Sequence, residues 1–441
     1  MRHDCCDYSG RPIGGAKPKG KFSRMPEVAP RTLTLPHAVF LERATNEPPT
    51  SAAVRLGQGA FLVLRLVDLL APDREPPTSP EVFRYQSAAT ERYCAELGPL
   101  GAEVAHLQGL VRNVQDVYAH QDARLITPAL LAYAHYLEDD GHYVEALDVL
   151  ETLLRVAERQ MRDADRIATA LRVGRVNRKM HRFDEAERWY TEAGDLASRV
   201  GDRFSVLLSR LGHANALQYR GNLAESERTY WSILADAQGE GSPQAEARAE
   251  HGLGSVLLHR GQPGEAIPHL WRSIEIYDDE ASRLRAFQDL GIGLLSLGDA
   301  DGAERALMQV VGRAPAADNL NNAMIELMNC ASYRRDRIGF ERWRERCQGA
   351  LPTMAPNIHA DFLLKAGIGL ARFGNFPKAE RLMEEALVIA SEHKLRAHEF
   401  KIERIKGGLN DCVACQGTPT ETVLQTPAVR EVSASLAALP V

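Results

Sequence analysis

The chain has 441 residues, of which 44% are hydrophobic and 25% charged, and its formal net charge at pH 7 is −6. The low aromatic fraction of 6%, together with abundant Ala, Leu, Arg and Glu, favours helices over β-sandwiches. Both signs of charge are interspersed along the sequence, so the clustered basic surface of a nucleic-acid-binding protein is not expected. The seven cysteines are too few and too scattered for a disulfide framework.

The sequence shows no segment typical of secretion or membrane insertion. The N-terminal region lacks the apolar run of about 7–15 residues, followed by small residues, that a secretory signal needs. The most apolar stretch, Ala60 to Ala71, contains Arg65 and Asp68 and is too short to span a bilayer. We therefore expect a cytoplasmic protein with no membrane partner.

Residues 1–50 are expected to form a disordered arm. Gly, Pro and Lys are frequent between Gly10 and Pro30, and no apolar periodicity persists. The first 31 residues carry seven basic and three acidic side chains, so the arm could touch an acidic surface, although a solvated tail is the simpler interpretation. Met25 is an alternative start of translation, which leaves open whether residues 1–24, with Cys5 and Cys6, are translated.

Residues 51–122 are predicted to form a helical N-terminal subdomain. One amphipathic helix starts near Ala52 and ends before Pro72, and a second starts with Ser79 as its N-cap. A third helix runs from about Gly101 to His120. We interpret the three helices as a subdomain that covers the first repeat. A DNA-binding helix-turn-helix is an alternative, but a short turn leading into a basic helix is not evident.

Residues 123–392 contain a short sequence motif that repeats at nearly fixed spacing. In its clearest copy, Gly261 ends one helix and Ala266 lies early in the next. The small residue after the turn marks the copies at Ala146, Ala186, Ser226, Ala266, Ala303 and Ala379. The spacings are 40, 40, 40, 37 and 76, so the last interval holds a degenerate unit marked by Phe340. Such periodicity predicts an all-α superhelical solenoid of seven helix pairs.

Each unit resembles the tetratricopeptide repeat, in a bacterial-type form whose units of 37–40 residues exceed the usual 34. In that family a small residue lies midway along the first helix, Gly ends it, and Ala lies early in the second helix. Small residues occur here twelve positions before the markers, at Ala134, Gly174, Ala214, Gly254, Gly291 and Gly367. Helix-ending glycines are Gly141, Gly221, Gly261, Gly298 and Gly374. The resemblance implies a right-handed superhelix.

The sixth unit departs from this pattern. Met328, Arg335 and Phe340 occupy its three diagnostic positions, where the family has small residues and Gly. We therefore expect its packing to be irregular, with a possible local kink.

The C-terminal region is expected to end the solenoid. Residues 393–409 form an amphipathic stretch that suits a capping helix, and residues 410–441 are expected to be a disordered tail. Cys412 and Cys415 have the spacing of half a zinc site or a redox pair, but no matching pair of ligands is evident. Chance placement is the simpler interpretation, and their role is left open.

Sequence motifs for catalysis are not found. There is no GxxxxGK[ST] or GxSxG motif, and the glycine pairs such as Gly252 with Gly254 lie within helices rather than after a strand. His398-Glu399 begins a zinc-protease motif, but Ile402 replaces its second histidine. We predict a protein that is not an enzyme and that needs no metal or other cofactor.

The resemblance implies that the first helices line a concave groove that binds extended or helical peptides. One row of candidate groove residues follows the small positions: His135, Arg175, Asn215, Ser255, Ile292, Asn329 and Ile368. A second row lies four residues further on: Asp139, Lys179, Tyr219, His259, Ser296, Tyr333 and Arg372. Arg178, Gln218, Arg248 and Arg285 are expected to project near these rows.

Twelve of these side chains are our candidate peptide-binding residues: His135, Arg175, Arg178, Lys179, Asn215, Gln218, Tyr219, Arg248, Ser255, His259, Arg285 and Asn329. Asparagine can donate to and accept from an extended backbone, and arginine favours carboxylates. Long polar side chains also line any solvated groove, which is the alternative for each residue.

The leading functional hypothesis is a non-enzymatic interaction scaffold that binds a protein or peptide, and acidic or carboxylate groups on that partner would suit the basic side chains. The alternative is a ligand- or peptide-sensing domain of a signalling or transcriptional system. A catalytic or metal-binding Cys412/Cys415 pair is a third hypothesis. The sequence leaves the identity of the partner and the oligomeric state open.

Overall fold

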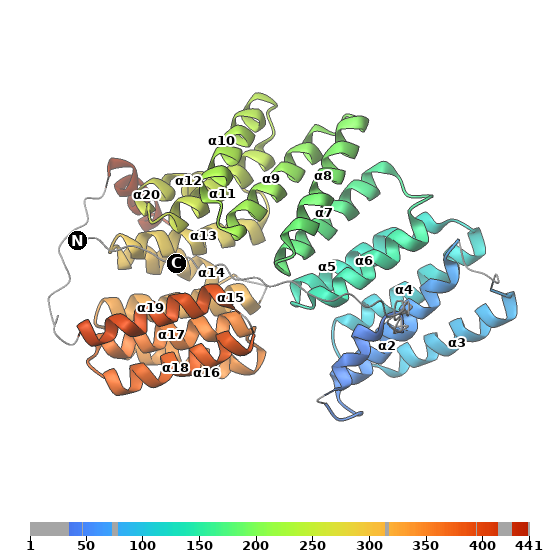
Figure 1. The fold of residues 1–441 in the computed structure, drawn as a ribbon, viewed down its shortest axis with the longest axis horizontal. Helices are drawn as coiled ribbons and strands as arrows, with labels where there is room; N and C mark the ends of the chain where they lie inside the picture. Colours follow the sequence, from blue (N-terminus) through green and yellow to red (C-terminus); the bar gives the residue numbers. More distant parts are fainter. Residues whose placement is uncertain are drawn as a thin grey trace, which may run out of the picture.

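The computed structural model describes residues 35–439, with gaps at 46, 73–77, 314–316, 394 and 413–425. The arm before residue 35, with Cys5, Cys6 and Met25, therefore lies outside the described residues, as does Cys415. The described part is an all-α solenoid without strands. Figure 1 shows it curving from the N-terminal helices, over α7 to α12, and back to α15 to α19. None of the described helices is long and apolar enough to cross a membrane.

The N-terminal helices precede the repeats and pack against the first of them. They are α1 (Ala38–Leu41), α2 (Ala52–Val67), α3 (Pro80–Glu96) and α4 (Glu103–His120), with 3₁₀ turns at Glu42–Ala44, Asp68–Leu70 and Ala123–Ile126. Ser51 and Ser79 cap α2 and α3 by accepting hydrogen bonds from the backbone N–H of Val54 and Val82.

The predicted disorder of residues 1–50 is wrong for the part that includes α1. Phe40 is completely buried and stacks on Tyr133, and His37 is buried beside Asp68 and Asp148. Arg43 donates to the carboxylates of Glu103 and Glu145. Because α1 has only four residues, its apolar side chains do not form a recognisable period, and contacts with distant helices hold it in place.

Seven helix pairs follow. Their first helices are α5 (Thr127–Asp139), α7 (Asp163–Lys179), α9 (Arg203–Arg220), α11 (Pro243–His259), α13 (Glu280–Ser296), α15 (Ala317–Tyr333) and α17 (Pro356–Arg372). Their second helices are α6 (Tyr143–Ala157), α8 (Phe183–Val200), α10 (Leu223–Gly239), α12 (Pro263–Ile276), α14 (Ala300–Val311), α16 (Arg337–Ala350, followed by a 3₁₀ turn at Leu351–Thr353) and α18 (Phe376–Glu392).

The small residues of the repeat allow the two helices of a pair to touch. A Cβ atom added to Gly254 would lie 2.5 Å from Cγ of Leu270, four residues after the marker Ala266. In the third pair the marker Ser226 donates its hydroxyl to the Ala214 carbonyl oxygen at 2.8 Å. At the turns, Gly261 has φ of 75°, a left-handed conformation that side chains adopt at a cost.

The sixth pair has no glycine at the turn between its two helices. Arg335 itself takes the left-handed conformation with φ of 61°. Phe340 is completely buried at the marker position, and Gly369 of the next first helix makes room for it, since a Cβ there would lie 2.2 Å from Cε2 of Phe340. The helices α15 and α16 are each continuous, and the seventh pair supplies the space for Phe340.

Two further helices follow the pairs. Helix α19 (Arg396–Cys412) packs on α17 and α18, close to the segment expected to cap the solenoid. The predicted disorder of residues 410–441 is wrong for α20 (Pro427–Ala437), which packs against α12 and α14 (Figure 1). Val429, Val432 and Leu436 are buried there, and Ser433 donates to Asp299 at 2.8 Å. These three apolar residues are too sparse among Ser and Ala to show a clear helical period, so the sequence analysis missed the helix.

The hydrophobic core is interrupted between α7 and α9. One cluster extends from Phe40 to Val176, another from Leu207 to Val256, and a third from Ala247 to Leu436. Between the first two lies a small cluster of Ile167, Leu196 and Ala197. Helix α8 nevertheless packs closely on both α7 and α9.

Candidate functional site

The first helices form one continuous wall of the solenoid, which we call the inner wall. Each first helix from α5 to α15 packs on the first helix of the next pair, as expected on the inner side of a curve. Across this curve, Asp318 at the start of α15 lies near enough to Lys179 and Asp140 to interact with them electrostatically. Burial raises the pKa of Asp318, Lys179 lowers it, and the net shift is upward. The solenoid therefore curves far enough to bring the start of α15 close to α5 and α7.

Arg175 and Lys179 lie on the inner wall, but a carboxylate of the protein holds both. Glu138 of α5 is completely buried and accepts from Nη1 of Arg172 at 2.7 Å, Nε of Arg175 at 2.5 Å and Nζ of Lys179 at 3.0 Å. Burial raises the pKa of Glu138, but Arg175, Lys179 and Arg172 outweigh it and lower the pKa to about 2. Much of the charge expected to attract a ligand is thus neutralised within the fold.

His135 lies next to this cluster. Its ring is half exposed and 3.2 Å from Asp139 on the same helix. Burial, followed by Arg172, lowers the pKa of His135, so the ring is predominantly neutral at pH 7. A neutral imidazole both donates and accepts, which suits contacts with a peptide backbone.

Arg178 lies one helical turn after Arg175 and has different neighbours. Its guanidinium carbon is 4.8 Å from the centroid of the Tyr219 ring, and the Tyr190 ring lies beside it. Tyr219 is 58% exposed, whereas Tyr190 is buried. Within the described part of the chain, Arg178 forms no ion pair with a carboxylate, and its Nε is buried without a hydrogen-bond partner.

Three predicted residues meet between α9 and α11. The amide nitrogen of Gln218 donates to Oγ of Ser255 at 2.8 Å and lies 3.0 Å from Nδ1 of His259. The neighbouring Asn215 donates to the Leu211 carbonyl oxygen of its own helix at 2.7 Å. These contacts stack adjacent units and set the orientation of the polar groups on the inner wall.

The remaining predicted residues do not join this group. Asn329 accepts a 2.8 Å hydrogen bond from Arg372, far along the solenoid. Arg248 and Arg285 lie near the start of α11 and α13, two turns before the first row of groove residues. There Arg248 donates to the Gln244 carbonyl oxygen at 3.1 Å, and Arg285 donates to Ser282 at 2.8 Å. The structure thus places these three at separate points rather than in one cluster.

The sequence analysis missed Glu138, Arg172 and Tyr190. Glu138 occupies the same repeat position as Arg178 and Gln218, four residues after the small residue, so extending that row to α5 would have identified it. Tyr190 lies on a second helix. It reaches the inner wall because Gly174 and Gly212 leave space for its ring, with added Cβ atoms 2.8 and 2.3 Å from its Cε1.

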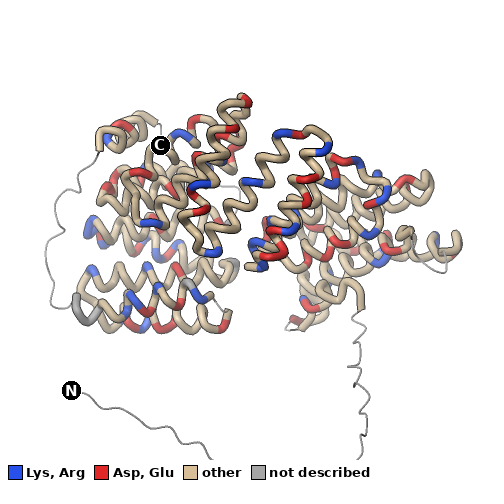
Figure 2. Tube along the Cα trace, turned by 45° about the horizontal axis from the view of Figure 1, so that its top comes forward, with Lys and Arg blue, Asp and Glu red and all other residues tan. Residues whose placement is uncertain are grey.

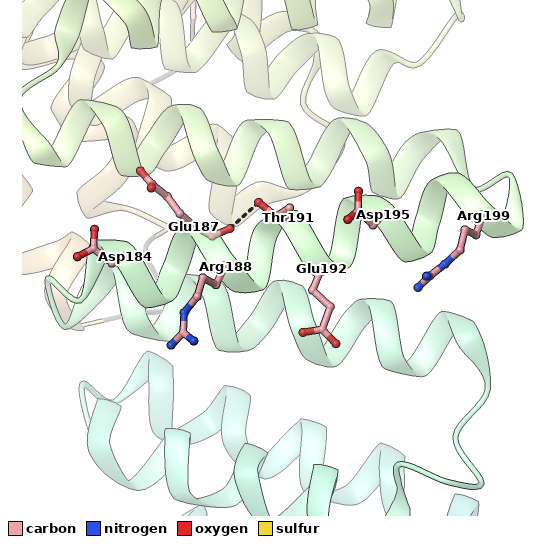
Figure 3. A pocket seen from close by; sticks show the side chains of 7 residues that line it. All are labelled: Asp184, Glu187, Arg188, Thr191, Glu192, Asp195 and Arg199. Atoms are coloured by element: carbon pink, nitrogen blue, oxygen red, sulfur yellow. Dashed lines mark hydrogen bonds between the residues drawn. The ribbon is translucent and has the colours of Figure 1, made fainter.

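A shallow hollow lies along α8, a second helix, and not on the inner wall. Figure 3 shows its seven lining residues on one helix: Asp184, Glu187, Arg188, Thr191, Glu192, Asp195 and Arg199. Asp184 and Glu187 also pair with Arg220 of α9. These side chains are mostly exposed, so the hollow is a solvated helix face.

The described residues offer little for thiol or metal chemistry. No group of three or more His, Cys, Asp or Glu within the described part is arranged to hold a metal ion. Cys94, Cys330 and Cys347 are buried free thiols, and burial raises their pKa values to about 11, 12 and 12. Such thiols are poor nucleophiles at neutral pH.

The arrangement defines an α–α solenoid of the tetratricopeptide-repeat-like fold, with a polar inner wall. No protein-family profile matches the sequence, and no curated protein is significantly similar to it. Solved structures are similar in fold. The Rap conjugation gene regulator of plasmid pLS20, in complex with the Phr* peptide, has a TM-score of 0.53 at 12% identity over 79% of this chain and 96% of its own.

A second solved structure supports the same fold. The apo form of the quorum sensor NprR from B. thuringiensis has a TM-score of 0.51 at 12% identity, over 76% of this chain and 97% of its own. At such low identity the similarity concerns the fold alone. It agrees with the tetratricopeptide-like repeat predicted from the spacing of the markers.

Proposed function

We propose that the chain is a non-enzymatic scaffold that binds a peptide, free or as part of a protein, along the inner wall between α5 and α11. The observation that carries this proposal is the row of polar side chains on the first helices α5, α7, α9 and α11. Tyr219 is largely exposed and Asn215 and Ser255 are half-buried, so ligands can reach them. The similar Rap regulator, which was solved with a peptide, supports this choice of ligand.

A partner with acidic or carboxylate groups fits the charge of this region. His135 aside, the inner wall from α5 to α7 holds Arg172, Arg175, Arg178 and Lys179 against Glu138 and Asp139. Elsewhere both signs alternate along the solenoid (Figure 2), which argues against a nucleic-acid partner. The buried, reduced thiols support a cytoplasmic setting. We propose no catalytic residue and no cofactor.

Peptide capture tests this function. An extended octapeptide spans roughly 26 Å, enough to cross three helices whose axes lie about 8–10 Å apart. We expect the immobilised full chain to retain a subset of random octapeptides, identified by mass spectrometry. The double variant Asn215→Ala/Tyr219→Ala should lose about tenfold in affinity for them, as expected when an interface aromatic is removed.

The control is Trp231→Ala, which removes an exposed aromatic side chain from the second helix α10. This variant should retain the same peptides as the natural chain. If the double variant also retains them undiminished, the ligand does not bind at the inner wall. If the natural chain retains none, the proposed function is wrong.

A peptide sensor is the second candidate function. The break between the apolar clusters near α8 favours it, because a ligand bound along α7 and α9 would contact the helices on both sides of the break. Binding would then change the curvature and could be transmitted to the helices at either end. The similar fold of a quorum sensor is compatible with this candidate.

A further inference from the structure

The segment from His37 to Ala44, which we call the strap, lies across the N-terminal subdomain and the first repeat. It comprises α1 and the 3₁₀ turn Glu42–Ala44, and α1 packs on α2 and α6. The four residues of α1 are too few for a helix that is stable by itself. Side-chain contacts with distant helices therefore hold the strap in place.

Three anchors provide these contacts. Phe40 is completely buried in the middle of the strap. At the C-terminal end, Arg43 donates to Glu103 at 2.9 Å and to Glu145 at 2.8 Å. His37 is the anchor at the N-terminal end, and only 3% of it is exposed. Because an arginine stays charged in a folded protein, His37 is the one polar anchor whose own charge can change near neutral pH.

Both ring nitrogens of His37 face carboxylate oxygens. Nδ1 lies 2.5 Å from Asp148 of α6, and Nε2 lies 3.1 Å from Asp68 in the turn after α2. An ionised carboxylate only accepts hydrogen bonds, so both nitrogens have to donate, which requires the imidazolium. In a neutral ring, one nitrogen would present a lone pair to a carboxylate. The geometry therefore identifies His37 as a protonated histidine that bridges two acids.

The charges around His37 balance in favour of the protonated ring. Three further charged side chains lie around the two acids: Arg65, Glu151 and Arg155. The arginines donate to Asp68, at 3.3 Å from α2 and at 2.5 Å from α6, and the glutamate interacts electrostatically with Asp148. Burial lowers the pKa of His37, but the hydrogen bonds to Asp148 and Asp68 outweigh it, and the net shift is upward. The docked strap therefore binds this proton more tightly than the free segment does.

We propose that the strap is a pH-sensitive clamp, which is docked while His37 is protonated and opens from its N-terminal end when this proton is lost. Deprotonation replaces one hydrogen bond to a carboxylate by repulsion between a lone pair and a buried negative charge. Because His37 and Phe40 are one helical turn apart, opening uncovers the apolar site beside Tyr133 that Phe40 fills. The clamp does not depend on the proposed peptide-binding function.

The direction of the pH dependence follows from the raised pKa of His37. The stabilisation of the docked strap is complete below the ordinary pKa of 6.5 and is lost as the pH rises through the higher pKa of the folded protein. The clamp therefore opens on the alkaline side of neutrality.

Hydrogen exchange of the full chain between about pH 6 and pH 9, corrected for the intrinsic pH dependence of exchange, tests the clamp. Residues 38–44 of the natural chain should lose at least about tenfold in protection over this range, since a hydrogen bond to a charged group is worth that much or more. Protection of α3 and α14 serves as the internal reference and should stay constant.

Two variants define the released strap. His37→Asn keeps a donor and tolerates the left-handed conformation of this position (φ 62°), but it carries no charge, so the strap should be equally unprotected at every pH. Gly57→Ala places a Cβ atom 2.3 Å from the carbonyl oxygen of Phe40 and should displace the strap at any pH. His269→Asn is the matched control, because His269 of α12 faces a single carboxylate, Glu250 of α11, at 2.6 Å.

Each outcome decides the proposal. A pH-dependent protection of the strap that His37→Asn abolishes and His269→Asn keeps supports the clamp. Protection that is constant with pH in the natural chain, or a pH dependence that persists in His37→Asn, overturns it. If circular dichroism shows that His37→Asn is unfolded, nitrogen-15 NMR of the natural chain labelled at histidine decides instead. Two protonated ring nitrogens of His37 at neutral pH support the clamp, and a single one overturns it.

Discussion

At the scale of single residues, Glu138 determines how much positive charge the inner wall presents. Its carboxylate joins α5 to α7 through three cations, two of which the sequence analysis assigned to ligand binding. The repeat register predicts that Arg175 and Lys179 share a wall with Asn215 and Ser255. It could not predict their pairing, because the pairing depends on the distance between helices of successive units rather than on periodicity.

Replacing Glu138 with Gln should destabilise the protein by about 3–5 kcal/mol, because three partly buried cations lose their shared counterion. Chemical denaturation at pH 7 measures the effect. The matched control is Glu240→Gln, whose partner Arg203 is 79% exposed and whose loss should cost less than about 1 kcal/mol. Equal effects of the two substitutions would show that Glu138 is not a structural counterion.

The same carboxylate gives a dependence on pH. Because the folded protein lowers the pKa of Glu138 from its ordinary 4.5 to about 2, its contribution is present above pH 4.5 and is lost as the pH falls towards 2. The free energy of unfolding of the Glu138→Gln variant should therefore fall less than that of the natural chain as the pH is lowered through this window. An acid profile identical in shape to that of the natural chain would contradict the assigned pairing.

At the scale of helices, the markers predicted the paired elements well because their cause is local. A small residue, a left-handed turn and a second small residue are all that two helices need to turn and touch. Phe340 shows the limit of such reasoning, since its fit depends on Gly369 in the following unit. The helices α1 and α20 were missed for a related reason: their few buried side chains contact helices far away in sequence.

Releasing α20 should be possible without unfolding the solenoid. The double variant Val432→Asp/Leu436→Asp places two charges against α12 and α14, where burial of each apolar side chain contributes at most about 1.5–3 kcal/mol. Hydrogen exchange should then show lost protection in residues 427–437 and little change in α11 and α13. The exposed Glu431→Asp serves as the control. Loss of protection throughout α11 to α14 would instead mean that α20 is part of the core.

At the scale of the whole molecule, the interrupted core divides the solenoid near α8. The markers distinguish the second pair only by His181, which stands where most other pairs have a glycine at the turn. The interruption arises because α8 is rich in charged residues and contributes few large apolar side chains between Val176 and Leu207. The fold class was thus predictable from spacing, whereas the division of the apolar core into clusters was not.

The sensor hypothesis predicts that the solenoid changes shape when a peptide binds, and this change can be measured. Octapeptides retained by the chain should reduce its radius of gyration in small-angle X-ray scattering if binding bridges α7 and α9. Hydrogen exchange should slow most in α7 to α9, where the peptide would bind. An unchanged scattering profile at saturating peptide would support a passive scaffold and contradict the sensor.

The docking of α20 also has a consequence for the time course of synthesis. Asp299 and Ser433, which it joins, are separated by 134 positions. At roughly 5–20 residues per second, the surface on α12 and α14 is translated about 7–27 s before the helix that covers it. During that interval the apolar surface that α20 later covers is exposed on the nascent chain, so a chaperone or another nascent chain would meet it before α20 does.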